Sequence, residues 1–387
     1  MQGNPVSEGS RPARDSSRAP VIGRRGLIAL LALIVTGIVT MMRGIEGEDP
    51  IRAWEIYLVN LLFWTGISQA GVIFSAMMVM TGARWWSSFS RIAERMASFL
   101  PVSLVFFILF FLAGKDLFPW TRLPEGSGSA WLRWDALVAR DLTGIALLSL
   151  VSFVFLKRAG RKRAVPSSGQ DRDRVLVILS PITIVLYAIV YSLLAIDLVM
   201  TLAPPWYSTL FGGYFFIGSL YSGLAAIAIL SVFFRESSDQ QETLRDSHLY
   251  DIGKLLLAFC MITGDFFWSQ FLVIWYGNIP EETVFLIERI GRPAWARLSW
   301  AVLLIAFILP FLILLSRRVK FSPRGMIAVS VIVLIGMWLE RFILVVPSVY
   351  RGDIVPLGWT EAGITLGFFG IFLVAFLTKK ISCQYPW

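Results

Sequence analysis

The residues of this chain most able to do chemistry are charged side chains inside long apolar stretches. Asp265 lies well inside the apolar run that ends at Trp275 and Tyr276. A carboxylate within a membrane-spanning helix is costly, and proton transfer needs groups that alternate between charged and neutral forms. The alternative is a polar side chain that is satisfied by a neighbouring helix.

Asp251 and Lys254 lie at the inner end of the same run. Lys254 and Asp265 fall on nearly one face of a helix, about 16 Å apart along its axis. That separation is too long for an ion pair but suits a chain of water molecules. We therefore expect Asp265, Lys254 and Asp251 to belong to a proton relay.

Most other charged residues of the apolar runs lie towards the outer ends of their helices. The further relay candidates are Glu55, Asp135, Asp141, Asp197, Glu340 and Arg341. Asp135, Arg140 and Asp141 point to different helix faces, so these three are not expected to form one site alone. Glu340 and Arg341 could instead form a structural ion pair, and Lys115 with Asp116 a snorkelling pair at a helix end.

Several kinds of chemistry are excluded. No phosphate-binding GxxxxGKS or dinucleotide-binding GxGxxG motif is present, and the single histidine, His248, removes the usual general base. Two cysteines, Cys260 and Cys383, are too few for a self-contained iron–sulfur cluster or four-cysteine zinc site. One histidine also excludes bis-histidine haem ligation. We expect this chain to bind no metal or other cofactor of its own.

The composition indicates an all-α, polytopic membrane protein. Of 387 residues, 56% are hydrophobic and 16% charged, and the mean hydropathy is +0.70; a soluble protein carries about a quarter charged residues. The net charge of +9 is explained by basic loops on one membrane face, so no nucleic acid partner is expected.

Helical spans must position the charged residues. We expect a disordered basic tail over 1–22, a transmembrane helical domain over 23–380 and a C-terminal tail over 381–387. Small-residue patterns favour two four-helix bundles, about 54–199 and 212–346, with two further peripheral helices. The ten expected spans are about 26–42, 54–80, 96–114, 134–156, 175–199, 212–234, 250–276, 295–316, 325–346 and 359–378.

Lysine and arginine in the connections set the orientation. About 23 fall in the N-terminal tail and the segments on its side of the membrane, against about nine on the opposite side. Both termini are therefore expected in the cytoplasm.

Several stretches resemble the polysulfide-reductase-type (NrfD-like) membrane subunits. They are NLLFWTGISQAGVIFSAMMVMTGARWW at 60–86, SQFLVIWYGNIPEET at 269–283, LPFLILLSRRVK at 309–320 and MWLERFILVVPSVY at 337–350. The resemblance covers roughly residues 50–350. Within this family the sequence is most similar to the second, smaller such subunit of bacterial alternative complex III.

The resemblance implies a non-catalytic or quinone-contacting subunit of a respiratory quinol oxidoreductase in the bacterial inner membrane. Its expected partners are a larger homologous membrane subunit, periplasmic iron–sulfur and multihaem cytochrome c subunits, and membrane lipids. Haem and iron–sulfur clusters would then belong to the partners. We expect the turn after the seventh span to dock extrinsic subunits through Trp275, Tyr276, Asn278, Glu281 and Glu282.

One segment departs from the family pattern. The larger subunit has a histidine at the outer end of its third span, within its quinol pocket, whereas the matching segment here is Ala113-Gly114-Lys115-Asp116. Lys115, Asp116 and Arg140 are the candidates for contact with a quinone. Proton conduction, quinone contact and assembly are therefore favoured over quinol oxidation at this subunit.

Two other functions stay open. A quinol-oxidising anchor of a molybdopterin/iron–sulfur reductase belongs to the same broad family, and its co-purifying partners would distinguish it. A secondary transporter with inverted repeats would have helices broken at mid-depth. Glycine and proline breaks here are expected at the ends of spans, which disfavours a transporter.

Overall fold

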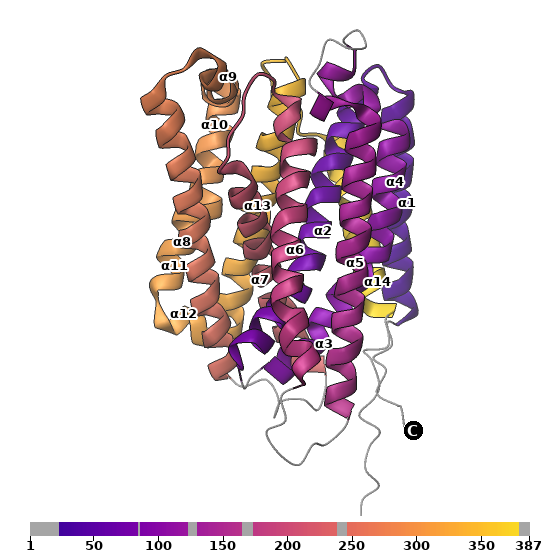
Figure 1. Ribbon diagram of the computed structural model, residues 1–387, viewed down its shortest axis with the longest axis vertical. Helices are drawn as coiled ribbons and strands as arrows, with labels where there is room; N and C mark the ends of the chain where they lie inside the picture. The colour runs from indigo at the N-terminus through magenta and orange to yellow at the C-terminus, as the bar shows by residue number, and fades with distance from the viewer. Residues whose placement is uncertain (1–22, 84–85, 123–129, 165–172, 238–245, 379–387) are drawn as a thin grey trace, which may run out of the picture.

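The computed structural model describes residues 23–83, 86–122, 130–164, 173–237 and 246–378 (Figure 1). These residues form helices and connecting loops without a β-strand, which confirms the all-α prediction. The tails expected over 1–22 and 381–387 lie outside the described residues.

Ten helical segments of the described chain are long and apolar enough to cross a membrane, as predicted. Eight of the described spans are single helices: α1 (Arg24–Glu46), α2 (Pro50–Thr81), α5 (Trp134–Ala164), α6 (Arg174–Leu198), α7 (Phe211–Ser237), α8 (Asp246–Gly277), α13 (Pro323–Val349) and α14 (Trp359–Thr378). The third combines α3 (Trp86–Met96), η1 (Ala97–Phe99) and α4 (Leu100–Ala113), and the eighth combines α10 (Pro293–Val302), η7 (Leu303–Ile308) and α11 (Leu309–Leu315).

Short helices lie between the spans. At the outer end these are η2 (Lys115–Leu117), η3 (Pro119–Arg122), η4 (Ala130–Leu132), η5 (Met200–Leu202) and α9 (Pro280–Ile290), and at the inner end α12 (Arg317–Phe321). The sequence left Pro280-Glu281-Glu282 open between a solvated turn and a helix N-terminus. The structure shows that it is the first turn of α9.

Helix α2 is the centre of the molecule. Asp49 caps it by accepting a hydrogen bond from the backbone N–H of Arg52, Pro50 occupies its first turn, and Gly82 ends it with a left-handed φ of 68°. From Ala53 to Ala76 almost every side chain is buried. A helix that is apolar all round is stable only when other helices enclose it.

The other spans surround α2 in an ordered way (Figure 1). Helices α4 and α6 each pack on α2 and on α5, while α7 and α13 pack on α2 and on each other, with α8 and α11 packed beside them. Helices α1 and α14 pair along their length and rest against α2. Helix α8 therefore lies at one edge of the molecule and α1 at the opposite edge.

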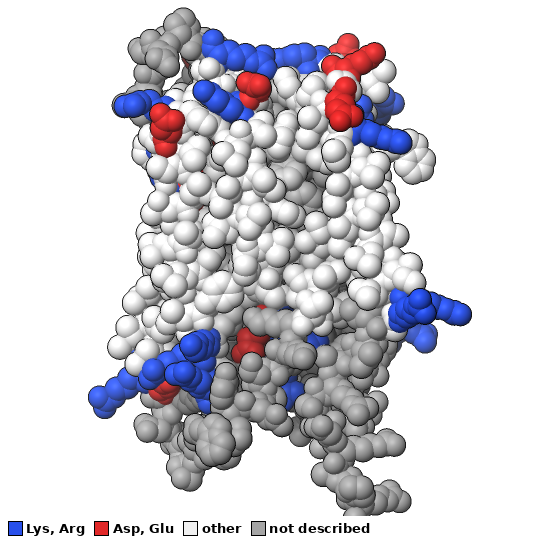
Figure 2. Space-filling view, turned by 90° about the vertical axis from the view of Figure 1, so that its right-hand side faces the viewer, with Lys and Arg blue, Asp and Glu red and all other residues white. Residues whose placement is uncertain are grey.

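On the face that Figure 2 shows, charged residues gather at the two ends and leave an apolar band between them. This distribution matches a bilayer whose hydrocarbon core accepts apolar side chains and whose interfaces accept charged ones.

The eighth span contains a wide π-helical turn, η7, in its middle. This corrects the expectation that breaks fall only at the ends of spans, although the chain stays helical through the turn. Pro310 has no N–H to offer the carbonyl of Ala306, and the hydroxyl of Tyr221 on α7 donates to that oxygen at 3.1 Å. Side chains from neighbouring helices commonly satisfy such freed carbonyls in membranes.

Candidate functional site

Asp197, at the outer end of α6, is the centre of a buried polar cluster. Its side chain is fully buried and accepts two hydrogen bonds, from Nε of Arg140 at 2.7 Å and from Nε1 of Trp131 at 2.9 Å. The Arg140 guanidinium also lies 3.9 Å from the centre of the Trp131 ring. Two donors, one of them cationic, stabilise the ionised form of the Asp197 carboxylate.

Asp141 adds a second carboxyl group to the Asp197 cluster. It is buried on α5, its side chain interacts with that of Asp197, and no donor among the described residues reaches either of its oxygens. Two carboxylates in contact repel each other unless one carries a proton that the pair shares. Because Asp197 already accepts two donors, Asp141 is the member placed to carry the exchangeable proton.

The Asp197 cluster could not be derived from α5 alone. Arg140 and Asp141 both contact Asp197 of α6. The spacing of residues along α5 does not reveal this contact with another helix. Asp135 is exposed at the start of α5 and takes no part in the cluster.

Glu340 and Arg341 form a second buried cluster on α13. Arg341 pairs with Glu340 at 3.3 Å, and its Nη2 donates to the carbonyl of Phe215 at 2.9 Å and to Oγ of Ser219 at 3.2 Å. Tyr214 of α7 lies next to the Glu340 carboxyl group. Glu340 is about 14 Å from the outer end of its helix, so this carboxyl group lies deeper than the Asp197 cluster.

A third group lies at the outer ends of α2 and α14. Arg52 donates to both oxygens of Glu361, at 2.6 and 2.8 Å, and the backbone N–H of Gly358 donates to the same carboxylate at 2.7 Å. Glu55 is buried beside this pair, and its Oε2 has no donor. The sequence indicated Glu55 as a relay candidate but not the Arg52–Glu361 pair beside it, because that pair depends on α2 and α14 being neighbours.

The remaining relay candidates lie outside these clusters. Lys254 forms an ion pair with Asp251 at 2.6 Å, and the side chains of both are partly exposed at the inner end of α8. Asp265 is also exposed, on the same outward face as Lys254, as the eleven-residue spacing predicts. Neither end of the proposed Lys254–Asp265 relay faces the interior, where the buried carboxyl groups lie.

The quinone-contact and docking candidates lie at the outer end. Lys115 and Asp116 are exposed in η2, while Arg140 is largely buried with Nη2 lacking an acceptor. Trp275 and Tyr276 are 63% and 85% exposed at the end of α8.

The docking segment continues from the end of α8 into α9. Asn278 bends the chain with a φ of 46°, and Glu281 and Glu282 lie in the first turn of α9. Acidic residues are favoured there by the helix dipole.

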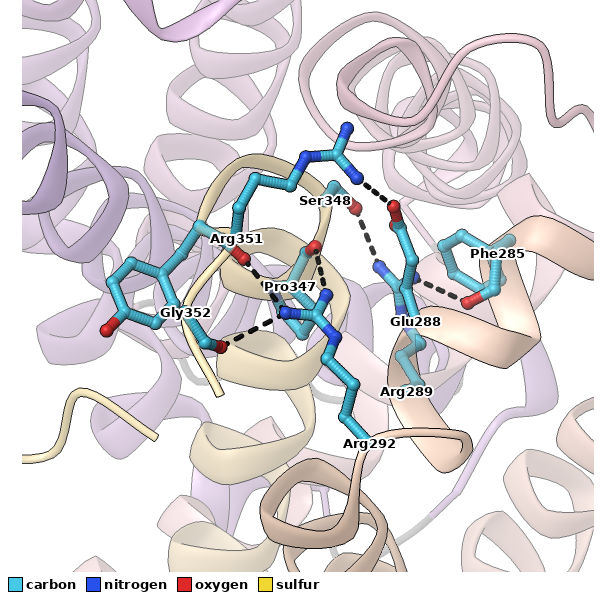
Figure 3. A network of polar contacts seen from close by, with 9 residues as sticks. Phe285, Glu288, Arg289, Arg292, Pro347, Ser348, Arg351 and Gly352 are labelled. Carbon is cyan, nitrogen blue, oxygen red and sulfur yellow. Dashed lines mark hydrogen bonds and ion pairs between the residues drawn. The ribbon is translucent and has the colours of Figure 1, made fainter. Parts of the chain in front are cut away.

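Arg289 of α9 links this short helix to α13 at the outer end of the molecule (Figure 3). Pro347 inside α13 cannot donate to the carbonyl of Ile343, and Nε of Arg289 donates to that oxygen at 3.0 Å. Its Nη2 donates to Leu344 O and to Oγ of Ser348, at 2.8 and 2.7 Å. Burial lowers the pKa of Arg289 to about 9, so the guanidinium still carries its charge at pH 7.

Two further arginines extend the Arg289 network at the end of α13. Arg292 donates to the carbonyl of Gly352 at 3.1 Å, and Arg351 pairs with Glu288 of α9 (Figure 3). Cations at a helix C-terminus are favoured by the helix dipole. The network therefore fixes α9 on α13 and has a structural role that the sequence did not indicate.

Ten candidate spans among the described residues define a polytopic membrane protein. The family model described as "Polysulphide reductase, NrfD" matches residues 45–351, and the chain belongs to this family. Comparison with curated proteins finds no match.

Family membership defines the chain as an integral membrane subunit of a quinol-linked oxidoreductase complex. Membrane anchors of this family bind quinones and associate with iron–sulfur redox subunits. Among the described residues, no group of three or more histidine, cysteine, aspartate or glutamate side chains could hold a metal ion.

Proposed function

We propose that this chain is the smaller NrfD-like subunit of a respiratory quinol:cytochrome c oxidoreductase of the alternative complex III type, and that it conducts protons through its outer half. Family membership and the ten spans support the placement in a quinol-linked complex. The resemblance at 269–283 and 337–350 supports the choice of this complex over a molybdopterin reductase.

The Asp141–Asp197 pair is the observation that carries the proposal. Arg140 and Trp131 both donate to Asp197, and the neighbouring Asp141, which has no donor among the described residues, is the member of the pair able to carry a proton. When Asp141 releases its proton, repulsion between two buried carboxylates favours rapid reprotonation. Glu340, with Tyr214 beside it, would take the proton deeper into the membrane.

Quinone contact fits Arg140 best among the three candidates. Its Nη2 is a buried donor without an acceptor, which is the chemistry that recognises a quinone carbonyl oxygen. Lys115 and Asp116 are exposed and would contact the headgroup only at its entrance. In this proposal quinol is oxidised at a partner subunit, since no histidine occupies the end of α4.

The test compares Asp141→Asn with Asp353→Asn, an exposed carboxylate in an outer loop. Both variants are purified as intact complexes and reconstituted in vesicles, where quinol oxidation and proton movement are measured together. We expect Asp141→Asn to lower proton movement per electron by about tenfold or more, and Asp353→Asn to leave it unchanged. Full coupling in an assembled Asp141→Asn complex would refute the relay.

The identity of the partner subunits is tested in a separate experiment. Affinity purification through this chain should recover haem c and iron–sulfur absorbance together with a larger homologous membrane subunit. Recovery of a molybdopterin-containing subunit would refute the choice of complex and leave the relay to be judged on Asp141→Asn.

A further inference from the structure

The outward face of α8 has a regular pattern. Ile262 and Val273 are exposed on this helix, and so are six residues spaced three or four positions apart: Ala258, Met261, Asp265, Trp268, Leu272 and Trp275. We call this set the α8 stripe. The opposite face of the helix carries buried residues such as Leu256 and Thr263, which pack into the bundle.

Residues three or four positions apart lie on one side of a helix, so the stripe marks one continuous side that lipid or another helix can cover. No described helix of this chain covers the stripe, because α8 lies at the edge of the molecule (Figure 1).

Asp265 lies near the middle of the apolar part of α8, on this stripe. Lys254 at the inner end and Trp275 at the outer end are residue types that mark membrane interfaces, and Asp265 is about 16 Å from Lys254 and about 15 Å from Trp275 along the helix. No hydrogen bond or ion pair links its carboxylate to another described residue. Lys254 cannot reach it, since its ammonium group pairs with Asp251.

A carboxylate that faces hydrocarbon at mid-depth needs a donor from outside this chain. Such groups in spanning helices face protein or water and pair with opposite charges. A single polar residue within a helix–helix contact line also fixes which partner binds and in which register. The exposed indole of Trp268 and thioether of Met261 flank Asp265 and would enclose the pair.

We propose that the α8 stripe packs against a membrane-spanning helix of a partner subunit, and that this helix presents an arginine or lysine to Asp265 at mid-depth. The proposal rests on the assignment of the chain as a subunit of a membrane complex. It assigns Asp265 to assembly and leaves proton transfer to the buried clusters.

The contact is tested in the resting complex with a photoreactive benzoylphenylalanine in place of Trp268. We expect irradiation to join it to a spanning peptide of a partner subunit that contains arginine or lysine, as identified by mass spectrometry. Adducts with lipid or quinone alone would overturn the proposal. Because this contact forms without turnover, its outcome is independent of proton transfer at Asp141.

The proposed ion pair of Asp265 is tested with the variant Asp265→Lys. The control is Leu150→Lys, which places the same ammonium group at an exposed position midway along α5. Like charges should separate the subunits, so we expect Asp265→Lys to lower the co-purifying membrane partner per tagged chain by about tenfold or more. Asp265→Asn, which keeps the size of the side chain, should retain more partner than Asp265→Lys. Equal recovery from Asp265→Lys and Leu150→Lys would overturn the pairing.

Discussion

At the scale of single residues, side chains from other helices replace hydrogen bonds that prolines remove. Pro347 leaves the carbonyl of Ile343 without a helical donor, and Arg289 donates a hydrogen bond to it. Pro310 does the same to the carbonyl of Ala306, which accepts from Tyr221. A buried carbonyl without a donor costs about 1–3 kcal/mol. These side chains therefore stabilise the helix that they contact and also fix its position against a neighbour.

The first prediction concerns Arg289 and Pro347. Arg289→Met should destabilise the protein by about 2 kcal/mol or more, because Ile343 O loses its donor. Adding Pro347→Ala should recover about 1 kcal/mol, since alanine supplies the missing helical N–H. Thermal unfolding in detergent measures both.

The matched control for Arg289→Met is Arg297→Met, which removes an exposed arginine from the neighbouring helix α10. It should change the unfolding temperature little. If Arg289→Met costs the same stability with and without Pro347, the pairing of this arginine with the freed carbonyl is wrong.

At the scale of the elements, small residues allow close helix contact. A Cβ atom added to Gly37 of α1 would lie 2.4 Å from the Cα of Gly367 on α14. The same atom added to Gly264 of α8 would meet nothing closer than Phe307, at 3.8 Å. Backbones that approach this closely gain packing energy, which is the main force between helices in lipid.

The second prediction compares Gly37→Ala with Gly264→Ala. The first should destabilise by about 1–3 kcal/mol, because α1 and α14 must move apart. The second should be neutral or slightly stabilising, since alanine favours the helix by up to about 1 kcal/mol. Denaturation in mild detergent measures the difference, and an equal loss in both variants would contradict the packing argument.

Element positions were largely predictable from the sequence, and their contacts were not. Long apolar runs define the ten spans, and Gly277-Asn278 marks the end of α8. The third span was predicted to start at 96, since the serines and arginines of α3 interrupt the apolar run, yet that helix continues the span inward.

The candidate site was only partly predictable for the same reason. Asp141 and Asp197 could be selected as membrane carboxyl groups, but their contact depends on which helices are neighbours. Asp265 could be placed at mid-depth by counting residues along α8. Its outward direction could not be derived, because α8 is apolar on every side and the sequence does not distinguish lipid, partner and core.

At the scale of the whole molecule, the ten described spans place the start of α1 and the end of α14 on the same side of the membrane, at the lower end of Figure 1. The excess of lysine and arginine in segments at that end predicts that it faces the cytoplasm.

The third prediction tests this orientation by cysteine labelling. In a Cys383→Ser background, where the remaining Cys260 is buried, Tyr207→Cys at the outer end should react with a membrane-impermeant maleimide in intact cells. Lys157→Cys at the inner end of α5 should react only after the cells are opened. The reverse pattern would show that the orientation is inverted.

The side chains that donate to the two carbonyls left free by proline also imply an order in which the helices enter the membrane. Tyr221 precedes Pro310 in the chain, and Arg289 precedes Pro347, so each donor is synthesised before the helix that needs it. Chains fold from the N-terminus during synthesis. Helices α11 and α13 therefore enter a membrane where α7 or α9 already carries the donor for the carbonyl that the proline leaves free.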